Sequence, residues 1–302
     1  MKQKNIFRRG LQYFIYKYPV LTRNLSDEIY LKFMYWVCIG KKLNLQNPRT
    51  FNEKLQWIKL YNRDPKYPAM VDKYAAKELI ADKIGKDYIA KNLAVWDTAE
   101  EINFDVLPNQ FVIKCTHDCG GMIICSDKRK LDQKQAREKM AKAMKSNYYF
   151  SGREWPYSRI RPRIIAEEYL EDKKTGELRD YKFFTFNGVP RILFVASERQ
   201  DINTETKFDF FDMDYRHLDI INGHPNAKIA PEKPVNFELM KELAAKLSTG
   251  IPHLRVDFYE VNGKVYVGEL TLFHWSGFVP FEPMSWDVKM GEWIDLPKEK
   301  II

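Results

Sequence analysis

Apolar residues recur at helical spacing near the start of the chain. Phe7, Leu11, Phe14, Ile15 and Tyr18 form the first such stripe, and basic residues stand beside it. The pattern fits a helix packed on the main domain, and it also fits a helix resting on a membrane surface. With the stripes that follow, it predicts that residues 1–70 are mostly helical.

Two further helices are expected before the first strand. One follows Asn52, its expected N-cap, and carries the apolar residues Leu55, Trp57 and Ile58. The other is a charged amphipathic helix over residues 71–83. Neither stretch carries chemistry by itself.

Beyond residue 88 the pattern changes to short runs that predict strands. Asn187-Gly188 and Asn262-Gly263 each stand between two strand-like runs, which is a strong short-range signal for a β-hairpin. Because the strands form hairpins and do not alternate strictly with helices, we expect an α+β fold rather than a doubly wound parallel sheet. Strands are expected at 89–96, 110–115, 122–125, 163–170 and 208–215 and on both arms of each hairpin, helices at 131–149 and 236–247, and a polar surface link at 151–163.

The second hairpin carries one acidic residue on each arm, Asp257 and Glu269. A plain two-residue loop would place these carboxylates on opposite faces, because side chains alternate along a strand. A three-residue loop with a bulge at Gly263 pairs Glu260 with Lys264 and separates a charged face from an apolar face, so we expect that register. The charged face would hold Arg255, Asp257, Glu269 and Thr271, and the apolar face Val256, Phe258, Tyr266 and Leu270. Two carboxylates on one face can hold Mg²⁺, although an exposed hairpin with ordinary surface charges is the alternative.

Composition narrows the class of protein. The chain has 302 residues, of which 45% are hydrophobic, enough for one large or two modest domains with a core. The longest apolar run, residues 33–39, is too short to span a bilayer, and no signal peptide is evident. Four cysteines do not make a disulfide framework, so a cytoplasmic protein is expected. The net charge of +8 is spread along the chain, which favours anionic small substrates or a site of action near a membrane over duplex nucleic acid.

A lysine and a glycine-bearing turn stand between two predicted strands, in the stretch F-V-I-K-C-T-H-D-C-G-G-M-I-I. The backbone N–H groups of such a turn, together with Lys114, suit the binding of phosphates, although no Walker A motif is present. Two alternatives stay open. One is an ordinary hairpin, and the other is a zinc site with irregular ligand spacing, formed by Cys115, His117, Cys119 and Cys125.

Other catalytic signatures are weak. The histidines are scattered and no G-x-S-x-G elbow occurs, so Ser-His-Asp catalysis is unsupported. The residues Asp212-Met213-Asp214 resemble the D-x-D with which many glycosyltransferases hold a nucleotide-sugar metal. An acidic turn gives the same three residues.

An ordered set of motifs resembles the TupA-like ATP-grasp family, which is named for teichuronopeptide synthesis and found in loci for capsule and cell-surface polysaccharides. The motifs are T-F-N-E-K-L-Q-W, V-I-K-C-T-H-D-C-G-G, I-A-E-E-Y-L, D-Y-K-F-F-T-F-N-G and R-V-D-F-Y, and the resemblance covers about residues 20–290. It implies two α+β subdomains with antiparallel sheets that grip ATP, at 71–165 and 166–302, after a helical region at 1–70. That region lacks the βαβ-like first domain of many ATP-grasp ligases.

The resemblance also implies roles for single residues. Asp257 and Glu269 would hold Mg²⁺, and Arg255 would neutralise charge that develops during transfer, with Lys182 beside it among the catalytic residues. Thr271 stands where the superfamily usually has Asn as a third metal ligand, and a hydroxyl is a weaker ligand than an amide carbonyl. The expected ATP contacts are Lys73, Lys114, His117, Gly120 and Gly121 at the phosphates, Glu167, Glu168, Tyr169 and Leu170 beside adenine, and Asp180 at the ribose or the metal.

From this resemblance we expect an ATP- and Mg²⁺-dependent carboxylate–amine ligase that acts through an acylphosphate. Its partners would be a carboxylate-bearing small molecule or glycan and an amino acid or other amine, with no nucleic acid. A peripheral contact of the basic N-terminus with the inner face of the membrane stays open. Phosphoryl transfer needs lysines, an arginine and acidic Mg²⁺ ligands rather than a protein nucleophile, and the chain has them. The alternatives are a glycosyltransferase that uses Asp212 and Asp214, a sugar kinase with the same ATP site, and a non-enzymatic assembly protein.

Overall fold

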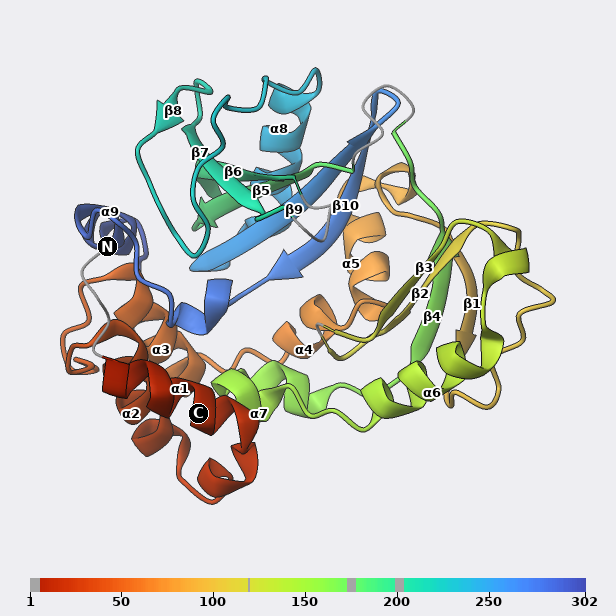
Figure 1. The fold of residues 1–302 in the computed structure, drawn as a ribbon. Coiled ribbons are helices and arrows are strands. Elements are labelled where there is room, and N and C mark those ends of the chain that lie inside the picture. Colours follow the sequence, from red (N-terminus) through yellow and green to blue (C-terminus); the bar gives the residue numbers. More distant parts are fainter. Residues whose placement is uncertain (1–5, 119, 173–177, 199–203) are drawn as a thin grey trace.

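A computed structural model describes residues 6–118, 120–172, 178–198 and 204–302. A helical region at one end adjoins two antiparallel sheets (Figure 1), which confirms the expected α+β class. The helices are α1 Ile6–Lys17, α2 Asp27–Ile39, α3 Phe51–Tyr61, α4 Tyr67–Val71, α5 Ala75–Ile84, α6 Gln133–Met144, α7 Tyr149–Gly152, α8 Phe237–Ser248 and α9 Ser285–Glu292. The strands are β1 Asn92–Trp96, β2 Phe111–Cys115, β3 Met122–Cys125, β4 Ile164–Glu168, β5 Asp180–Phe186, β6 Val189–Ser197, β7 Lys207–Asp212, β8 His217–Leu218, β9 His253–Val261 and β10 Lys264–Thr271.

Residues 6–70 are mostly helical, as predicted, but the N-cap of α3 lies two residues before the expected one. Thr50 caps the helix through a capping box: its hydroxyl accepts from the Glu53 N–H at 3.2 Å, and the Glu53 carboxylate accepts from the Thr50 N–H at 3.1 Å. Asn52 is instead buried inside the helix, where its N–H donates to Asp287 at 2.9 Å. Across the described ranges, none of the helices has the length and apolar character needed to cross a membrane.

The smaller sheet has the strand order β1-β4-β2-β3. Its strand β2 alternates cleanly, because Phe111, Ile113 and Cys115 are buried in a core with α6 while Val112 and Lys114 face the other way. All of β4 pairs within this sheet, so a division between residues 165 and 166 would cut through a strand. The position of the domain boundary stays a prediction.

The larger sheet has the order β10-β9-β5-β6-β7-β8, with every neighbouring pair antiparallel. Helix α8 packs against β5, β6 and β9 on one face, where residues such as Phe183 and Phe258 are fully buried. The opposite face meets the N-terminal helices, and Phe51 of α3 stacks edge-on against Phe184 of β5. The charged side chains of the sheet lie on this second face.

The hairpin β9–β10 has a different register from the expected one. The predicted bulge at Gly263 is wrong: Val261 pairs with Lys264 across a two-residue turn, in which Asn262 and Gly263 both have positive φ (51° and 78°). The irregularity lies at Gly268 instead, between the Val267–Phe258 and Glu269–Asp257 pairs. The bulge still brings the two carboxylates onto one face. It also moves Tyr266 onto that face, so the prediction that Tyr266 shares the apolar face with Phe258 is wrong.

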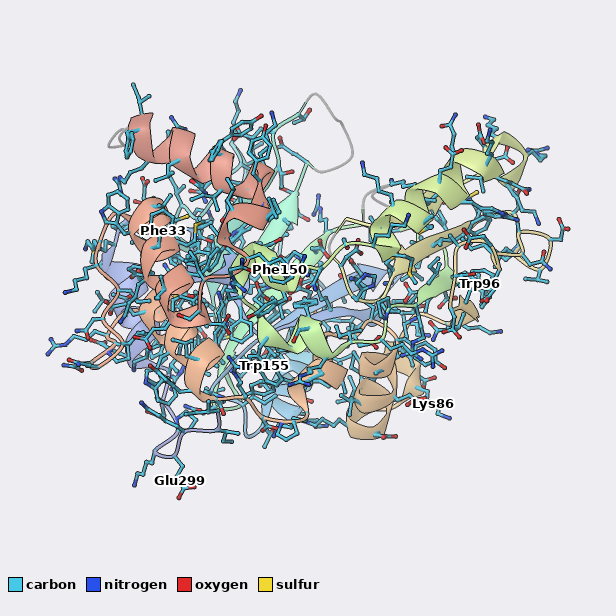
Figure 2. All side chains as sticks on the ribbon, turned by 90° about the horizontal axis from the view of Figure 1, so that it is seen from below. Phe33, Lys86, Trp96, Phe150, Trp155 and Glu299 are labelled. Atoms are coloured by element: carbon cyan, nitrogen blue, oxygen red, sulfur yellow. The ribbon has the colours of Figure 1, made fainter. Side chains whose placement is uncertain are left out.

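The segment 151–163 was expected on the surface, and this prediction is wrong for its first half. Arg153, Glu154, Trp155 and Tyr157 are all buried, and Figure 2 shows Trp155 in the middle of the molecule. Their polar groups find partners far away in sequence: the Arg153 guanidinium donates to the Thr22 carbonyl at 2.7 Å. Burial of a polar stretch is possible here because the N-terminal helices supply these acceptors.

Candidate active site

Three neighbouring strands place the central charges of the site in one row across the larger sheet. Glu269 on β10 pairs with Asp257 on β9, and Asp257 pairs with Lys182 on β5. The Lys182 ammonium contacts the Asp257 carboxylate directly and lies 3.3 Å from Asp180. The structure thus brings together four of the residues that the sequence singled out, and their roles stay predictions.

Arg255 holds Asp257 in a bidentate ion pair. Its Nε and Nη2 donate to the two carboxylate oxygens at 2.7 Å each, and Nη2 also donates to the Thr271 hydroxyl at 3.0 Å. Burial would raise the pKa of Asp257, but Arg255 and then Lys182 lower it below its usual value. Asp257 is therefore a buried carboxylate anion. Burial dominates at Lys182 and lowers the pKa of its amine, against the attraction of Asp257.

A neutral histidine fixes the far side of Arg255. Nη1 of Arg255 donates to Nδ1 of His274 at 2.8 Å, so the ring proton sits on Nε2, which lies 2.8 Å from the Asn222 side-chain oxygen. Burial and the positive charge of Arg255 keep the pKa of His274 well below its ordinary value. His274 therefore orients the guanidinium without adding charge.

The turn after His274 is strained and firmly held. Trp275, Ser276 and Gly277, in the 3₁₀ segment His274–Gly277 (η5), all have positive φ. The Ser276 carbonyl accepts from Gln56 at 2.9 Å and from the buried Lys59 at 2.8 Å, while its hydroxyl donates to Glu154. Burial lowers the pKa of Lys59 to about 7 against the attraction of Glu154. The N-terminal helices therefore brace the segment that positions Arg255.

On the smaller sheet, Glu167 is buried between two lysines. Its carboxylate lies 2.6 Å from Lys77 of α5 and 2.6 Å from Lys114 of β2. Burial alone would raise the pKa of Glu167, but Lys114 and Lys77 together hold it below its usual value. The predicted contact residue Lys114 thus already has an anionic partner, which a bound anion would share or replace.

Lys73 connects α5 to the loop after β2. Its backbone N–H donates to the Thr116 carbonyl at 3.1 Å, and its ammonium donates to the Asp118 carbonyl. Within the loop, the Gly121 N–H donates to the Asp118 carboxylate at 2.9 Å. His117 and Gly121 are buried, Gly120 is exposed, and these three do not line the cavity described below.

The segment after β4 runs along the tip of the β9–β10 hairpin. At its start, Glu168, the last residue of β4, accepts from the N–H of Lys91, which precedes β1, at 2.8 Å. Further on, the Asn262 N–H donates to the Asp172 carboxylate at 2.8 Å, and the Asn262 side chain donates to the Glu171 carbonyl at 3.2 Å. The connection between the two sheets is therefore fastened to the hairpin that carries the acidic pair.

A cavity of about 640 Å³ lies between the two sheets. The smaller sheet contributes Val112 and Lys114, and the hairpin contributes Tyr259 and Tyr266, which pair across the strands next to Asp180. Its volume is within the range of small-molecule sites. Of the predicted site residues, those that line it are Lys73, Lys114, Glu167, Glu168, Tyr169, Leu170 and Glu269. Those that do not are His117, Gly120, Gly121, Asp180, Lys182, Arg255, Asp257 and Thr271, of which the last five belong to the charged face of the sheet that carries Glu269.

The described geometry does not support two of the sequence alternatives. Cys125 pairs with Phe111 while Cys115 lies at the other end of β2, so the proposed zinc ligands are spread along a hairpin; Cys119 lies outside the described residues. In the described ranges, no three His, Cys, Asp or Glu side chains gather as metal ligands. The two carboxylates of the D-x-D stretch, Asp212 and Asp214, lie within 3.9 Å and 3.1 Å of Arg216 in a surface turn.

Several lining residues were missed from the sequence. Lys77 follows Lys73 by one helical turn, a spacing that could have identified it. Tyr259 stands two residues after Asp257 and therefore on the same face of β9. Tyr266 could not have been found without the bulge at Gly268. Glu154, which does not line the cavity but braces the turn at Ser276, was also missed, because its partner lies 122 residues away.

The arrangement suits a polyanion and a hard divalent cation. Lys73, Lys77 and Lys114 offer positive charge to the cavity, and Mg²⁺ is usually bound by one or two carboxylates together with substrate phosphates. Glu269 reaches the cavity, Asp257 faces Glu269 across the strands, and both offer carboxylate oxygens. The residues therefore fit such a cation.

The sequence was compared with models of protein families and with curated proteins. The sequence profile of the TupA-like ATPgrasp family matches residues 53–295, whereas comparison with curated proteins gave no match.

Similar solved structures include the ATP-grasp ligase PsnB with a minimal precursor, Mg and ADP (12% identity, TM-score 0.42, 85% of this chain and 65% of that one). D-alanine–D-alanine ligases are also similar, from Bacillus anthracis (17% identity, TM-score 0.38, 68% of this chain and 57% of that one) and from Helicobacter pylori (14% identity, TM-score 0.44, 83% and 68%). This chain thus spans less than two thirds of the length of PsnB and of the Bacillus anthracis ligase.

Proposed function

The chain belongs to the TupA-like ATP-grasp family, and on this premise we propose that it is an ATP- and Mg²⁺-dependent carboxylate–amine ligase. The observation that supports this most is the row Glu269–Asp257–Lys182 at the edge of the cavity. With the adjoining Arg255, the row combines two carboxylates with two cations that are largely shielded from solvent, Lys182 and Arg255. Acyl activation by phosphoryl transfer depends on such positioning and charge neutralisation.

In this proposal the nucleotide occupies the cavity between the sheets. Apolar lining residues such as Val112 and Leu170 suit a purine ring, and Lys73, Lys77 and Lys114 suit the phosphates. Asp257 and Glu269 would hold Mg²⁺, which would supply positive charge beside the phosphate oxygens.

The reaction has two balanced steps. A substrate carboxylate attacks the γ-phosphorus of ATP, which gives an acylphosphate and ADP; an amine then attacks the acyl carbon, forms an amide and expels inorganic phosphate. Arg255 is held rigidly by Asp257, Thr271 and His274, so its guanidinium meets developing negative charge without reorganising.

For the substrates, we propose an amino acid joined to a uronic acid or an amino sugar of a surface polysaccharide. The support is the resemblance of the motifs to a family found in loci for such polysaccharides. A glycan with several hydroxyls and a carboxylate also agrees with the positive net charge of +8.

Nucleotide binding tests the first half of the proposal. Millimolar ATP with Mg²⁺ should raise the melting temperature of the protein, and Asp257→Asn or Glu269→Gln should weaken this shift severely. A shift with a nucleotide-sugar and none with ATP would remove the proposal and favour a glycosyltransferase.

Product formation tests the second half. ADP release should require a carboxylate, such as glucuronic acid, and an amino acid together, with an amide detected by mass spectrometry. ADP release with a neutral sugar alone, and a phosphorylated product, would identify a sugar kinase instead.

A further inference from the structure

The first helix presents an unusually apolar surface to solvent. Of the 23 large hydrophobic side chains that are exposed in the described chain, eight lie between Ile6 and Leu21, with exposed fractions from 43% to 81%. We call these eight residues the N-terminal apolar face. They belong to α1 and to the 3₁₀ turn Pro19–Thr22 (η1) and are Ile6, Phe7, Tyr13, Phe14, Tyr16, Tyr18, Val20 and Leu21.

Packing inside the chain accounts for only part of this face: of the eight residues, Tyr16 reaches Cys38 of α2 with its hydroxyl. Helix α1 uses only a narrow side for the core, where Ile15 is buried and Leu11 packs partly against the cluster that contains α2. Ile6, Gly10, Tyr13 and Lys17 recur every three or four residues on another side. In Figure 2, α1 (red) runs along the edge of the molecule with side chains projecting outward.

The segment that carries this face has charges of one sign. The first 26 residues contain six Lys and Arg residues and no Asp or Glu. Among the described ones, Arg9, Lys17 and Arg23 are exposed, and the Lys17 ammonium lies 5.6 Å from the ring centres of both Tyr13 and Tyr18. Tyrosine and cationic side chains beside exposed aliphatic ones are typical of the interface between water and lipid headgroups.

We propose that the N-terminal apolar face docks this protein on an anionic lipid bilayer. Amphipathic helices bind membranes by burying apolar side chains at the headgroup boundary while nearby cations attract anionic lipids, and two such signals together give stable binding. A second copy of the chain fits less well, because pairing the two faces would bring Arg9, Lys17 and Arg23 of each copy close to like charges. This inference does not depend on the proposed ligase activity.

Sedimentation with vesicles tests the proposal on the full chain. Vesicles of phosphatidylcholine with phosphatidylglycerol should retain the protein at least about tenfold more strongly than phosphatidylcholine alone, and added salt should weaken the binding. The double variant Val20→Asp/Leu21→Asp should lose at least about tenfold of the partitioning. Ile229→Asp/Val235→Asp removes two hydrophobic side chains elsewhere that are even more exposed, and this variant should bind like the unchanged protein.

Two double variants with the same change in net charge separate the effect of charges beside the face from the effect of the net charge of the protein. Arg9→Glu/Lys17→Glu should lower partitioning about tenfold or more, whereas Lys134→Glu/Lys246→Glu, with the same change in net charge at exposed sites outside the face, should not. Unchanged melting temperatures show that each variant is folded.

Three results would overturn the proposal. One is the absence of binding of the unchanged protein to anionic vesicles at low salt. A second is equal loss of binding in the control variants. A third is a dimer in sedimentation velocity that Val20→Asp/Leu21→Asp dissociates, without vesicle binding, which would assign the face to a second copy of the chain.

Discussion

Arg255 contacts the two opposed carboxylates unequally: its guanidinium lies 2.7 Å from Asp257 and 3.9 Å from Glu269. Asp257 is buried, whereas Glu269 lines the cavity. The two acids face each other across β9 and β10, so they share a place in the site but differ in what they do for the fold.

Removing one or the other charge should separate these contributions. Asp257→Asn should lower the free energy of unfolding by about 3 kcal/mol, because Arg255 loses its bidentate anion and Lys182 keeps only Asp180, while both cations are largely shielded from solvent. Glu269→Gln should change it by less than about 1 kcal/mol. Both should reduce Mg²⁺-dependent ADP formation about 100-fold or more. Urea unfolding and ADP release measure the two effects, and Glu299→Gln at an outlying position (Figure 2) is the control. Full activity of Glu269→Gln would exclude it as a metal ligand.

Thr271 offers a way to tune the metal. Its hydroxyl accepts from Arg255 at 3.0 Å, and an amide oxygen at this position would be a stronger ligand for a hard cation. Thr271→Asn should therefore lower the Mg²⁺ concentration needed for half-maximal ADP formation several-fold, and Thr271→Val should raise it. A Mg²⁺ titration at saturating ATP measures this. If the two variants shift in the same direction, the side chain acts through Arg255 and not on the metal.

Glu167 should stabilise the nucleotide-free protein and should compete with bound ATP for Lys77 and Lys114. Glu167→Gln leaves Lys77 and Lys114 close together without their anion, so the free energy of unfolding should fall by about 3–5 kcal/mol. ATP would replace the lost negative charge, so its stabilising effect should be larger in the variant. Thermal unfolding with and without ATP measures both quantities. Glu299→Gln, at an outlying position (Figure 2), is the control. Equal ATP shifts in the unchanged protein and in Glu167→Gln would place the phosphates away from these lysines.

Because His253 is buried in its neutral form, we expect the free energy of unfolding to fall in acid. Its Nδ1 lies 3.0 Å from the Thr185 carbonyl, and burial among Phe51, Phe184 and Phe186 lowers its pKa to about 3. The unfolded state takes up a proton near pH 6.5, whereas the folded state resists protonation until about pH 3. Stability should therefore fall as the pH drops through this range, by about 2 kcal/mol at pH 5.

The variant His253→Asn keeps a donor for Thr185 and removes the titration. Its free energy of unfolding should depend less on pH between 7 and 5, although part of the loss remains because the pKa of His274 is also lowered. Urea unfolding at several pH values measures this. Identical pH dependence in both proteins would exclude His253 as a source.

Gly268 should be needed for the shape of the cavity. A Cβ at this position would lie 2.6 Å from the ring of Tyr259, so Gly268→Ala must displace a lining residue. We expect a weaker affinity for ATP, measured by titration calorimetry, with a smaller effect on stability. Gly10→Ala, where a Cβ meets nothing within 4 Å, should leave the affinity unchanged and stabilise α1 by about 0.5–1 kcal/mol. An unchanged ATP affinity in Gly268→Ala would place the nucleotide away from Tyr259.

Local signals in the sequence were enough for the elements of the fold. Both Asn-Gly hairpins and the helical first 70 residues were predicted, because turn chemistry and periodicity act over a few residues. The N-cap of α3 was missed, although Thr50 and Glu53 form a capping box in the sequence. The burial of Arg153 and Glu154 could not be predicted, since their partners lie more than 100 residues away.

For the site, Asp257 and Glu269 lie on one face as expected, but for a different structural reason. A regular turn at Asn262-Gly263 and a bulge at Gly268 produce this, in place of the expected bulge at Gly263. A glycine inside a strand often marks a bulge, so Gly268 could have indicated the bulge. The prediction placed it at Gly263 instead, next to the strong turn signal of Asn262-Gly263. The loop residues His117, Gly120 and Gly121 were expected at the phosphates, yet they do not line the cavity.

The bulge at Gly268 divides β10 into two segments. In one segment the odd-numbered side chains face the cavity side of the sheet, and in the other the even-numbered ones do. Between the bulge and the tip, an insertion or deletion of two residues in each arm preserves which side chains face the cavity, so this half can change length in even steps. Between Gly268 and Thr271, one added or lost residue would turn the Glu269 side chain from the charged face into the hydrophobic core, because side chains alternate along a strand. We therefore expect related sequences to vary in length at the hairpin tip and to keep a fixed spacing from the glycine to the acid.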